Sequence, residues 1–215
     1  MIPIELENWP RKPLLEKYAG YTFPYINIGA EIDVTNLYHF VKKEKLSFYC
    51  AMIYVATEAA LEIENFKYRV IDGRPMLCES LTPVFTYLPE GQEQFYLVSQ
   101  PLEEDLIGFC KKAKAKAEAM KNDKLHAYMH GKDEVEILYI SCIPWIHYTH
   151  FIRTYEDADK DNIPRISWGK YAKDRDGRVM LPFSVQVHHT LMDGYHVGMY
   201  FKKVEETLAC AAFLR

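Results

Sequence analysis

A histidine pair at the end of an apolar segment is the part of this sequence best suited to chemistry. The segment reads Leu181-Pro-Phe-Ser-Val-Gln-Val-His-His189 and continues with Thr-Leu-Met-Asp-Gly194. Histidine is the side chain whose unperturbed pKa is close enough to neutrality to accept and return a proton within one turnover. A strand end that opens into a loop can hold such a ring against a cleft while the backbone stays rigid. The pattern therefore indicates a site of proton transfer.

Two other interpretations of the histidines stay open on residue type and position. Adjacent residues of a strand point to opposite faces, so His188 and His189 are poorly placed to bind one metal together, and either can be a hydrogen-bonded core residue. His147 and His150 lack the helical H-E-x-x-H spacing of zinc hydrolases. The five cysteines are scattered and form no C-x-x-C pair. We expect no metal, and a structural histidine pair competes equally with a catalytic one.

The composition is that of an ordinary folded domain. With 215 residues, of which 49% are hydrophobic and 26% charged, the chain predicts one domain over residues 1–215. Lys and Arg total 26 against 30 Asp and Glu, and the resulting net charge of −4 disfavours nucleic acid as a partner. No stretch approaches the roughly 18 apolar residues of a membrane span, and the first residues do not resemble a secretory signal. We expect no membrane partner and a location in the reducing cytoplasm.

The elements that must position the histidine segment alternate between short strands and a few helices. Asp72-Gly73, between two β-type runs, predicts a hairpin over 68–78. Periodicity, turn residues and caps predict further strands at 25–35, 83–87, 95–99, 135–142, 148–153, 165–172 and 179–189, and helices at 47–66, 102–121 and 194–212. The predicted fold class is α+β, a two-layer sandwich in which helices pack on one face of a mixed, mostly antiparallel sheet.

Three sequence blocks resemble one enzyme family. The pattern His-His-x-x-x-Asp-Gly at 188–194, with Gln186-Val187 before it and Tyr195-His196 after it, resembles the active-site signature of the type A, trimeric chloramphenicol acetyltransferases. Asn8-Trp9-Pro10-Arg11 and Ile140-Ser141-Cys142-Ile143-Pro144-Trp145 match the same family in the same order. The core is also similar to the wider coenzyme A-dependent acyltransferase superfamily. The resemblance implies a single acetyltransferase domain that moves acetyl from acetyl-CoA to a small-molecule hydroxyl. It also implies a homotrimer with active sites between subunits.

The resemblance also assigns catalytic roles. His189 would be the general base that removes the proton of the acceptor hydroxyl as it attacks the thioester, while His188 would be structural. Ser141 would donate to the tetrahedral oxyanion, and losing one such donor typically costs about 2.7–4 kcal/mol of barrier. Ser167 stands at the place of a family threonine that assists through water. Asp193 would pair with Arg11 and brace the loop, in place of acting as the third member of a triad.

The resemblance assigns the two substrate sides of the site as well. Lys170, Tyr171 and Trp145 would line the coenzyme A tunnel, whereas Ser47 stands at a position where the family offers another lysine to the phosphates. The aromatic positions of the acceptor pocket fall at Tyr18, Phe95, Tyr128 and Phe151. Pro24 and Arg153 depart from that pocket's pattern, and a guanidinium in an apolar pocket is costly unless it meets an anion or a hydrogen-bond acceptor. We therefore expect an acceptor more polar than chloramphenicol, or weak turnover of chloramphenicol.

Two alternative functions compete with this one. A dihydrolipoamide acyltransferase core would need a lipoyl domain and an Ala/Pro-rich linker, and the sequence contains neither. A non-catalytic small-molecule-binding module that kept the fold would be expected to lose its base or its oxyanion donor first. The joint presence of His189, Ser141, Arg11 and Asp193 argues against that alternative.

Overall fold

A mixed sheet forms the centre of the molecule. The computed structural model describes residues 1–120, 134–156 and 160–210. In strand order the sheet contains β2 (Tyr25–Asp33), β10 (Val179–His188), β8 (Arg165–Gly169), β7 (Ile137–Ile143), β5 (Thr82–Tyr87) and β6 (Tyr96–Ser99), and β9 (Ala172–Lys173) pairs with β10. β7 runs parallel to both β5 and β8, whereas the other pairings are antiparallel. The predicted mixed, mostly antiparallel sheet is confirmed.

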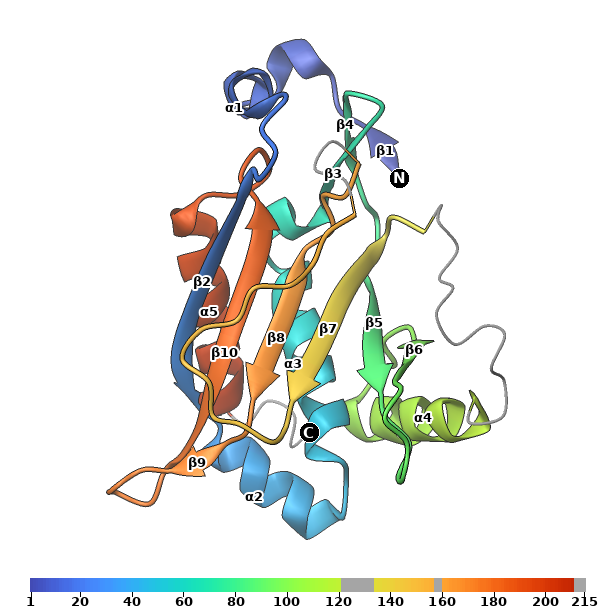
Figure 1. The fold of residues 1–215 in the computed structure, drawn as a ribbon, viewed down its shortest axis with the longest axis vertical. Helices are drawn as coiled ribbons and strands as arrows, with labels where there is room; N and C mark the ends of the chain where they lie inside the picture. Colours follow the sequence, from blue (N-terminus) through green and yellow to red (C-terminus); the bar gives the residue numbers. More distant parts are fainter. Residues whose placement is uncertain (121–133, 157–159, 211–215) are drawn as a thin grey trace.

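The larger helices lie on one side of this sheet, as the two-layer prediction requires. Figure 1 shows α3 (Phe48–Leu61) and α5 (Gly194–Cys210) behind the strands, with α2 (Thr35–Glu44) and α4 (Leu106–Ala119) near the lower end. At the other end of the sheet lie α1 (Lys12–Tyr18) and a small second sheet of β1 (Ile2–Pro3), β4 (Arg74–Leu77) and β3 (Tyr68–Ile71). Two short 3-10 helices, η1 (Leu6–Asn8) and η2 (Glu64–Lys67), complete the described elements. No helix in the described residues is long and apolar enough to cross a membrane.

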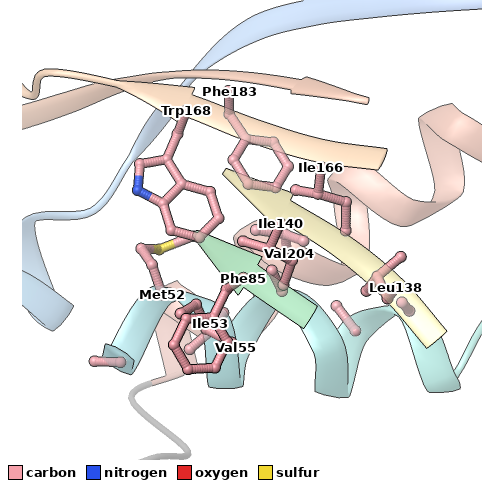
Figure 2. Packing of buried hydrophobic residues seen from close by; sticks show 14 of the residues in the cluster. Met52, Ile53, Val55, Phe85, Leu138, Ile140, Ile166, Trp168, Phe183 and Val204 are labelled. Carbon is pink, nitrogen blue, oxygen red and sulfur yellow. The ribbon is translucent and has the colours of Figure 1, made fainter. Parts of the chain in front are cut away.

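The core fills the space between α3 and the helix-facing side of the sheet. α3 is apolar on most sides, and its buried residues lie on several of its faces. A helix with this pattern is stable when other elements surround it. Ser47 caps its first turn, because the Ser47 hydroxyl accepts a hydrogen bond from the backbone N–H of Cys50. Figure 2 shows Trp168, Phe183 and Phe85 packed toward this helix. Since side chains alternate along a strand, the residues between these core positions must face the other side of the sheet.

One predicted hairpin is confirmed, whereas two predicted helices have different ends. The hairpin at 68–78 is confirmed, with Asp72 and Gly73 at φ 50° and 75°, the left-handed values that such a two-residue turn requires. The helix predicted at 102–121 begins later, because the Asp105 side chain caps its first turn by accepting from Gly108 N–H at 2.7 Å. The helix predicted at 47–66 ends at Leu61 and is followed by η2.

The strand predicted at 148–153 is wrong. Residues 146–153, called the crossing segment below, have no strand pairing and instead run across the face of the sheet opposite the helices (Figure 1). Side-chain contacts fix it there: the Tyr148 hydroxyl lies 2.7 Å from Ser184 Oγ, and Arg153 N–H donates to Gln186 Oε1 at 2.8 Å. The alternation of large and polar residues therefore reflects packing onto a sheet face, not membership of the sheet.

The strand predicted at 165–172 is broken after Gly169. A Cβ built at Gly169 would lie 2.7 Å from the carbonyl oxygen of Ile146, so only glycine allows the crossing segment to approach β8 this closely. Immediately afterwards, Lys170 N–H donates to the same oxygen at 2.7 Å. This contact ends the pairing of β8 with β10. The chain pairs with β10 again at β9.

Candidate active site

His189 is the first residue beyond β10 and is held at its backbone, at the Nδ1 edge of its ring and by one stacked aromatic ring. Its N–H donates to the Pro24 carbonyl at 2.7 Å. Its Nδ1 lies 3.0 Å from the Met192 carbonyl oxygen and 3.1 Å from Asp193 Oδ1. The Tyr18 ring stacks on the imidazole, with centroids 4.8 Å apart and planes 21° apart. Both neighbours of Nδ1 are acceptors, so a hydrogen bond there requires the proton on Nδ1 and leaves the Nε2 lone pair available.

His188 occupies a different environment from its neighbour. It is the last residue of β10, it is buried, and its Nδ1 accepts from Thr190 N–H at 3.3 Å. Its ring also meets the edge of Tyr25, with the centroids 5.2 Å apart. The structure thus separates the pair, with one ring packed inside and one ring partly exposed.

Arg11 holds the loop that follows His189. Its Nη1 and Nη2 donate to the two carboxylate oxygens of Asp193 at 2.9 and 3.2 Å. Its Nε donates to the Thr190 carbonyl at 2.6 Å, and Nη2 also reaches the His189 carbonyl at 2.9 Å. The Arg11 guanidinium lowers the pKa of Asp193, chiefly through this hydrogen bonding. One arginine therefore fixes both the backbone and the carboxylate beside the imidazole.

Two contacts around Asp193 were not predicted from the sequence. The carboxylate that pairs with Arg11 also lies 3.1 Å from His189 Nδ1, so Asp193 contacts both side chains. In addition, Asp193 N–H donates to His196 Nδ1 at 3.1 Å. Burial lowers the pKa of His196, and the charge of Arg11 lowers it further. The neutral form of the ring, which this lower pKa favours, can accept the hydrogen bond, and the i, i+3 spacing at the start of α5 was the available signal for it.

Ser141 and Ser167 belong to a row of hydroxyl side chains across the sheet. Ser141 on β7 is paired with Ser167 on β8, and Ser167 is paired with Ser184 on β10. All three face away from the core, because their neighbours Ile140, Ile166 and Val185 are buried in it. The row continues to Thr86 on β5, whose Oγ1 lies 3.4 Å from Ser141 Oγ. The neighbouring strands therefore present Ser141 on the face that the crossing segment covers.

Within one chain, the candidate base and the candidate oxyanion donor are far apart. His189 lies five residues beyond Ser184 along β10, and Ser141 lies two strands away from Ser184. At about 3.3 Å per residue and about 4.8 Å per strand, the two sites are separated by about 16 Å along the strand and about 10 Å across the sheet, or about 19 Å in all. A single chain does not bring His189 and Ser141 to the same reacting carbonyl.

The candidate coenzyme A residues gather at one edge of the sheet. β7 and β8 are parallel, with Ile143 opposite Gly169, so Trp145 and Lys170 follow strands that end side by side. Trp145 is 67% exposed, and the Tyr171 ring contacts Tyr38 and Phe48 at 5.3 and 5.2 Å between centroids. Ser47 immediately precedes Phe48 at the start of α3, and its hydroxyl is used in capping. An exposed indole, an ammonium and a phenol thus share one end of the sheet.

The candidate acceptor residues divide between the two halves of the site. Tyr18 lies against His189, together with the Pro24 carbonyl. Phe151 and Arg153 belong to the crossing segment, and the Phe151 ring lies 5.5 Å from that of Tyr148. Phe95 is 46% exposed and precedes β6. Tyr128 lies outside the described residues. Among the residues that the structure describes, no group of three or more His, Cys, Asp or Glu side chains is arranged to hold a metal.

Comparison with solved structures first defines the class of the fold. A chloramphenicol acetyltransferase structure covers 95% of this chain and 98% of its own, with a TM-score of 0.87 and 26% sequence identity. A probable dihydrolipoamide acetyltransferase from Listeria monocytogenes 4b F2365 is similar over 98% of this chain and 94% of its own, with a TM-score of 0.68. At 14% identity that second likeness concerns the fold alone. The fold is that of the coenzyme A-dependent acyltransferases.

Sequence comparison then defines the family. The model of the chloramphenicol acetyltransferase family matches residues 1–205, so this chain belongs to that family and is an acyltransferase. Chloramphenicol acetyltransferase 3 of Escherichia coli is 27% identical over 202 residues, which cover 94% of each chain. The chloramphenicol acetyltransferase of Clostridium perfringens is 29% identical over 208 residues, covering 94% of this chain and 92% of its own. The resemblance predicted from three sequence blocks is confirmed.

Proposed function

We propose that this protein is an acetyl-CoA-dependent O-acetyltransferase in which residues 1–215 act as one acetyltransferase domain. His189 is the general base, and the observation that carries this assignment is the pair of acceptors around its Nδ1. With the proton held on Nδ1, the Nε2 lone pair takes the proton of the acceptor hydroxyl. The hydroxyl oxygen then bonds to the thioester carbonyl carbon.

The charge that develops on the carbonyl oxygen needs a donor placed in advance, and Ser141 is the proposed donor. Ser141 lies within a row of hydroxyls on strands that are fixed by pairing on both sides, so it needs little reorganisation during the reaction. Ser167 is the neighbour that can hold a bridging water. When the tetrahedral intermediate collapses, the carbon–sulfur bond breaks and His189 returns the proton to the departing coenzyme A thiolate.

The separation of about 19 Å between His189 and Ser141 in one chain, estimated from strand spacings, supports an active site assembled between subunits. In a cyclic assembly each chain offers the same two half-sites to its two neighbours. His189 and Tyr18 of one chain then face Ser141, Phe151 and Arg153 of the next. We propose the homotrimer of the type A enzymes as that assembly.

Acetyl-CoA is proposed to lie along the edge formed by Trp145, Lys170 and Tyr171. The Lys170 ammonium is suited to a phosphate, and the exposed Trp145 and Tyr171 rings are suited to pack against adenine or the pantetheine arm. The proposed acceptor is chloramphenicol or a more polar small-molecule alcohol. Since acetyl-CoA is a metabolite of the reducing cytoplasm, that is the compartment proposed for the reaction, and it suits the five free cysteines.

The test is release of free thiol from acetyl-CoA in the presence of chloramphenicol and a panel of small alcohols. We expect His189→Ala to lower kcat at least 10²-fold, since general acid–base catalysis typically contributes about 10²–10⁴-fold. His39→Ala, which alters an exposed histidine on α2, is the matched control and is expected to match the wild type. Equal rates for His189→Ala and the wild type would remove His189 from the mechanism. Absence of thiol release with every alcohol would favour a binding module.

A further inference from the structure

The side chain of Arg153 is held over the serine-bearing face of the sheet. Its backbone is fixed at both ends by Gln186 on β10: N–H donates to Oε1 at 2.8 Å, and the carbonyl accepts from Nε2 at 3.2 Å. Its guanidinium lies over the ring of Tyr139 on β7, with Cζ 5.9 Å from the ring centroid. Because β8 lies between β10 and β7, the arginine extends across β8 and is fixed at each end.

This guanidinium has no anionic partner among the described residues. None of its nitrogens makes a hydrogen bond or ion pair with them, and Nη1 is buried without any partner. The nearby carboxylate of Asp161 accepts from Arg165 and from Glu156 N–H, although its Oδ1 makes no hydrogen bond. Arg165 also lies over Tyr139, at 5.5 Å, and adds a second positive charge. The one nearby carboxylate is therefore paired with Arg165, and the Arg153 guanidinium makes no ion pair with it.

Burial, and next the charge of Arg165, lower the pKa of Arg153 to about 10. The group therefore remains a cation at neutral pH. A partly buried guanidinium whose buried Nη1 has no hydrogen-bond partner is costly, and proteins keep such a group where an anion or strong acceptor completes it. Its planar fork matches the two oxygens of a carboxylate better than an ammonium would.

The position of Arg153 relative to Ser141 follows from strand register. Gln186, Arg165 and Tyr139 form one paired row across β10, β8 and β7. The row of Ser184, Ser167 and Ser141 is the next row on the same face, two residues along each strand. Residues two apart on a strand are separated by about 7 Å. The row that contains Tyr139, over which the guanidinium lies, is therefore next to the row that contains Ser141.

We propose that Arg153 binds a carboxylate of the acceptor, so that the preferred substrates are alcohols that carry a carboxylate group. The inference rests on the proposed acetyl transfer, because it places the acceptor hydroxyl beside Ser141 and the carboxylate at Arg153. The names of the family and of the similar proteins do not specify a carboxylate on the acceptor.

Two isosteric alcohols test the proposal: 4-(hydroxymethyl)benzoate, which carries a carboxylate, and 4-(hydroxymethyl)benzamide, which is neutral. In the wild type we expect kcat/KM for the carboxylate to exceed that for the amide at least tenfold, mainly through KM. In Arg153→Leu the ratio should fall to about one, and Arg153→Lys should keep part of it. Arg178→Leu, which alters an exposed arginine near the start of β10, is the matched control and should keep the wild-type ratio.

The outcomes separate this proposal from the proposed reaction. Acetylation of both alcohols without a carboxylate preference in the wild type overturns the anion site and leaves acetyl transfer standing. If neither alcohol is acetylated, binding of the two compounds is compared by saturation-transfer NMR. Binding of the carboxylate that is lost in Arg153→Leu and partly kept in Arg153→Lys then supports the site although the reaction fails. Equal binding of both compounds overturns the proposed carboxylate site. A lower Tm of Arg153→Leu, without a carboxylate preference in the wild type, also overturns it.

Discussion

The Nδ1 atom of His189 lies 3.1 Å from Oδ1 of Asp193, and the same carboxylate accepts two hydrogen bonds from Arg11. The imidazole is therefore oriented by a carboxylate that is itself fixed by a residue near the other end of the chain. The Met192 carbonyl, 3.0 Å from Nδ1, provides a second acceptor. The orientation of the proposed base His189 therefore depends on an ion pair that can be altered without changing His189 itself.

The first prediction concerns the pH dependence of that ion pair. Arg11 lowers the pKa of Asp193, and His189 and His196 face the same carboxylate. A depressed pKa in the folded state gives stability that is complete above the ordinary value of about 4 and is lost as pH falls through the folded pKa. We expect the Tm advantage of the wild type over Asp193→Asn to shrink below about pH 4, measured by thermal unfolding at fixed protein concentration. An undiminished advantage at about pH 3 would contradict the assignment.

The second prediction concerns His196, whose Nδ1 accepts from Asp193 N–H. His196→Leu removes the acceptor and leaves a partly buried N–H without a partner, which typically costs about 1–3 kcal/mol. We expect a loss of kcat of about tenfold or more in acetyl transfer, because the loop that orients His189 shifts. His196→Asn, whose side-chain oxygen can replace Nδ1, should restore most of the rate. Equal kcat values for His196→Leu and His196→Asn would exclude this positioning role.

The third prediction concerns the contact between β8 and the crossing segment. In Gly169→Ala the new Cβ would lie 2.7 Å from the Ile146 carbonyl oxygen, a backbone atom that cannot move alone. Overpacking of this kind typically costs about 1–3 kcal/mol, so we expect a lower Tm. Gly198→Ala is the control, because nothing lies within 4 Å of its Cβ position on α5 and alanine favours the helix. An equal Tm for the two variants would show that the crossing segment can move away from β8 at little cost in stability.

The fourth prediction separates the two serines of the hydroxyl row. Ser141→Ala should lower kcat by about 10²–10³-fold with little change in KM, the effect expected of a lost oxyanion donor. Ser167→Ala should have a smaller effect, since the role proposed for Ser167 is to hold a bridging water. Steady-state kinetics with acetyl-CoA and chloramphenicol measures both. A larger loss in Ser167→Ala than in Ser141→Ala would reverse the assignment.

The sequence predicted those features that depend on short-range signals. The Asp72-Gly73 hairpin and the strand leading to His188 follow from local turn chemistry and periodicity. The segment around Tyr148 and Arg153 was wrongly predicted as a strand, because its residue pattern cannot distinguish pairing within a sheet from packing across one. Only strand register shows whether a residue can join the ladder, and register is a long-range property.

The site was predictable in part: the family resemblance supplied one long-range pair, but not the contacts around it. Family resemblance led to the pairing of Arg11 with Asp193, which lie 182 positions apart and which no local pattern connects. The contacts of Asp193 with His189 and His196 depend on how the loop after β10 turns, so the sequence alone did not reveal them. The missing partner of the Arg153 guanidinium likewise became visible only when its neighbours were in place.

The most direct test of an active site shared between subunits is complementation between two inactive variants. Ser141→Ala and His189→Ala chains are unfolded, mixed in equal amounts and refolded, and thiol release from acetyl-CoA is measured with chloramphenicol or with whichever alcohol the wild type acetylates. In a ring with one half-site from each neighbour, about a quarter of the interfaces regain both intact residues, so about a quarter of wild-type activity should return. Activity no greater than that of the two refolded variants separately would show that His189 and Ser141 serve the same chain, contrary to this account.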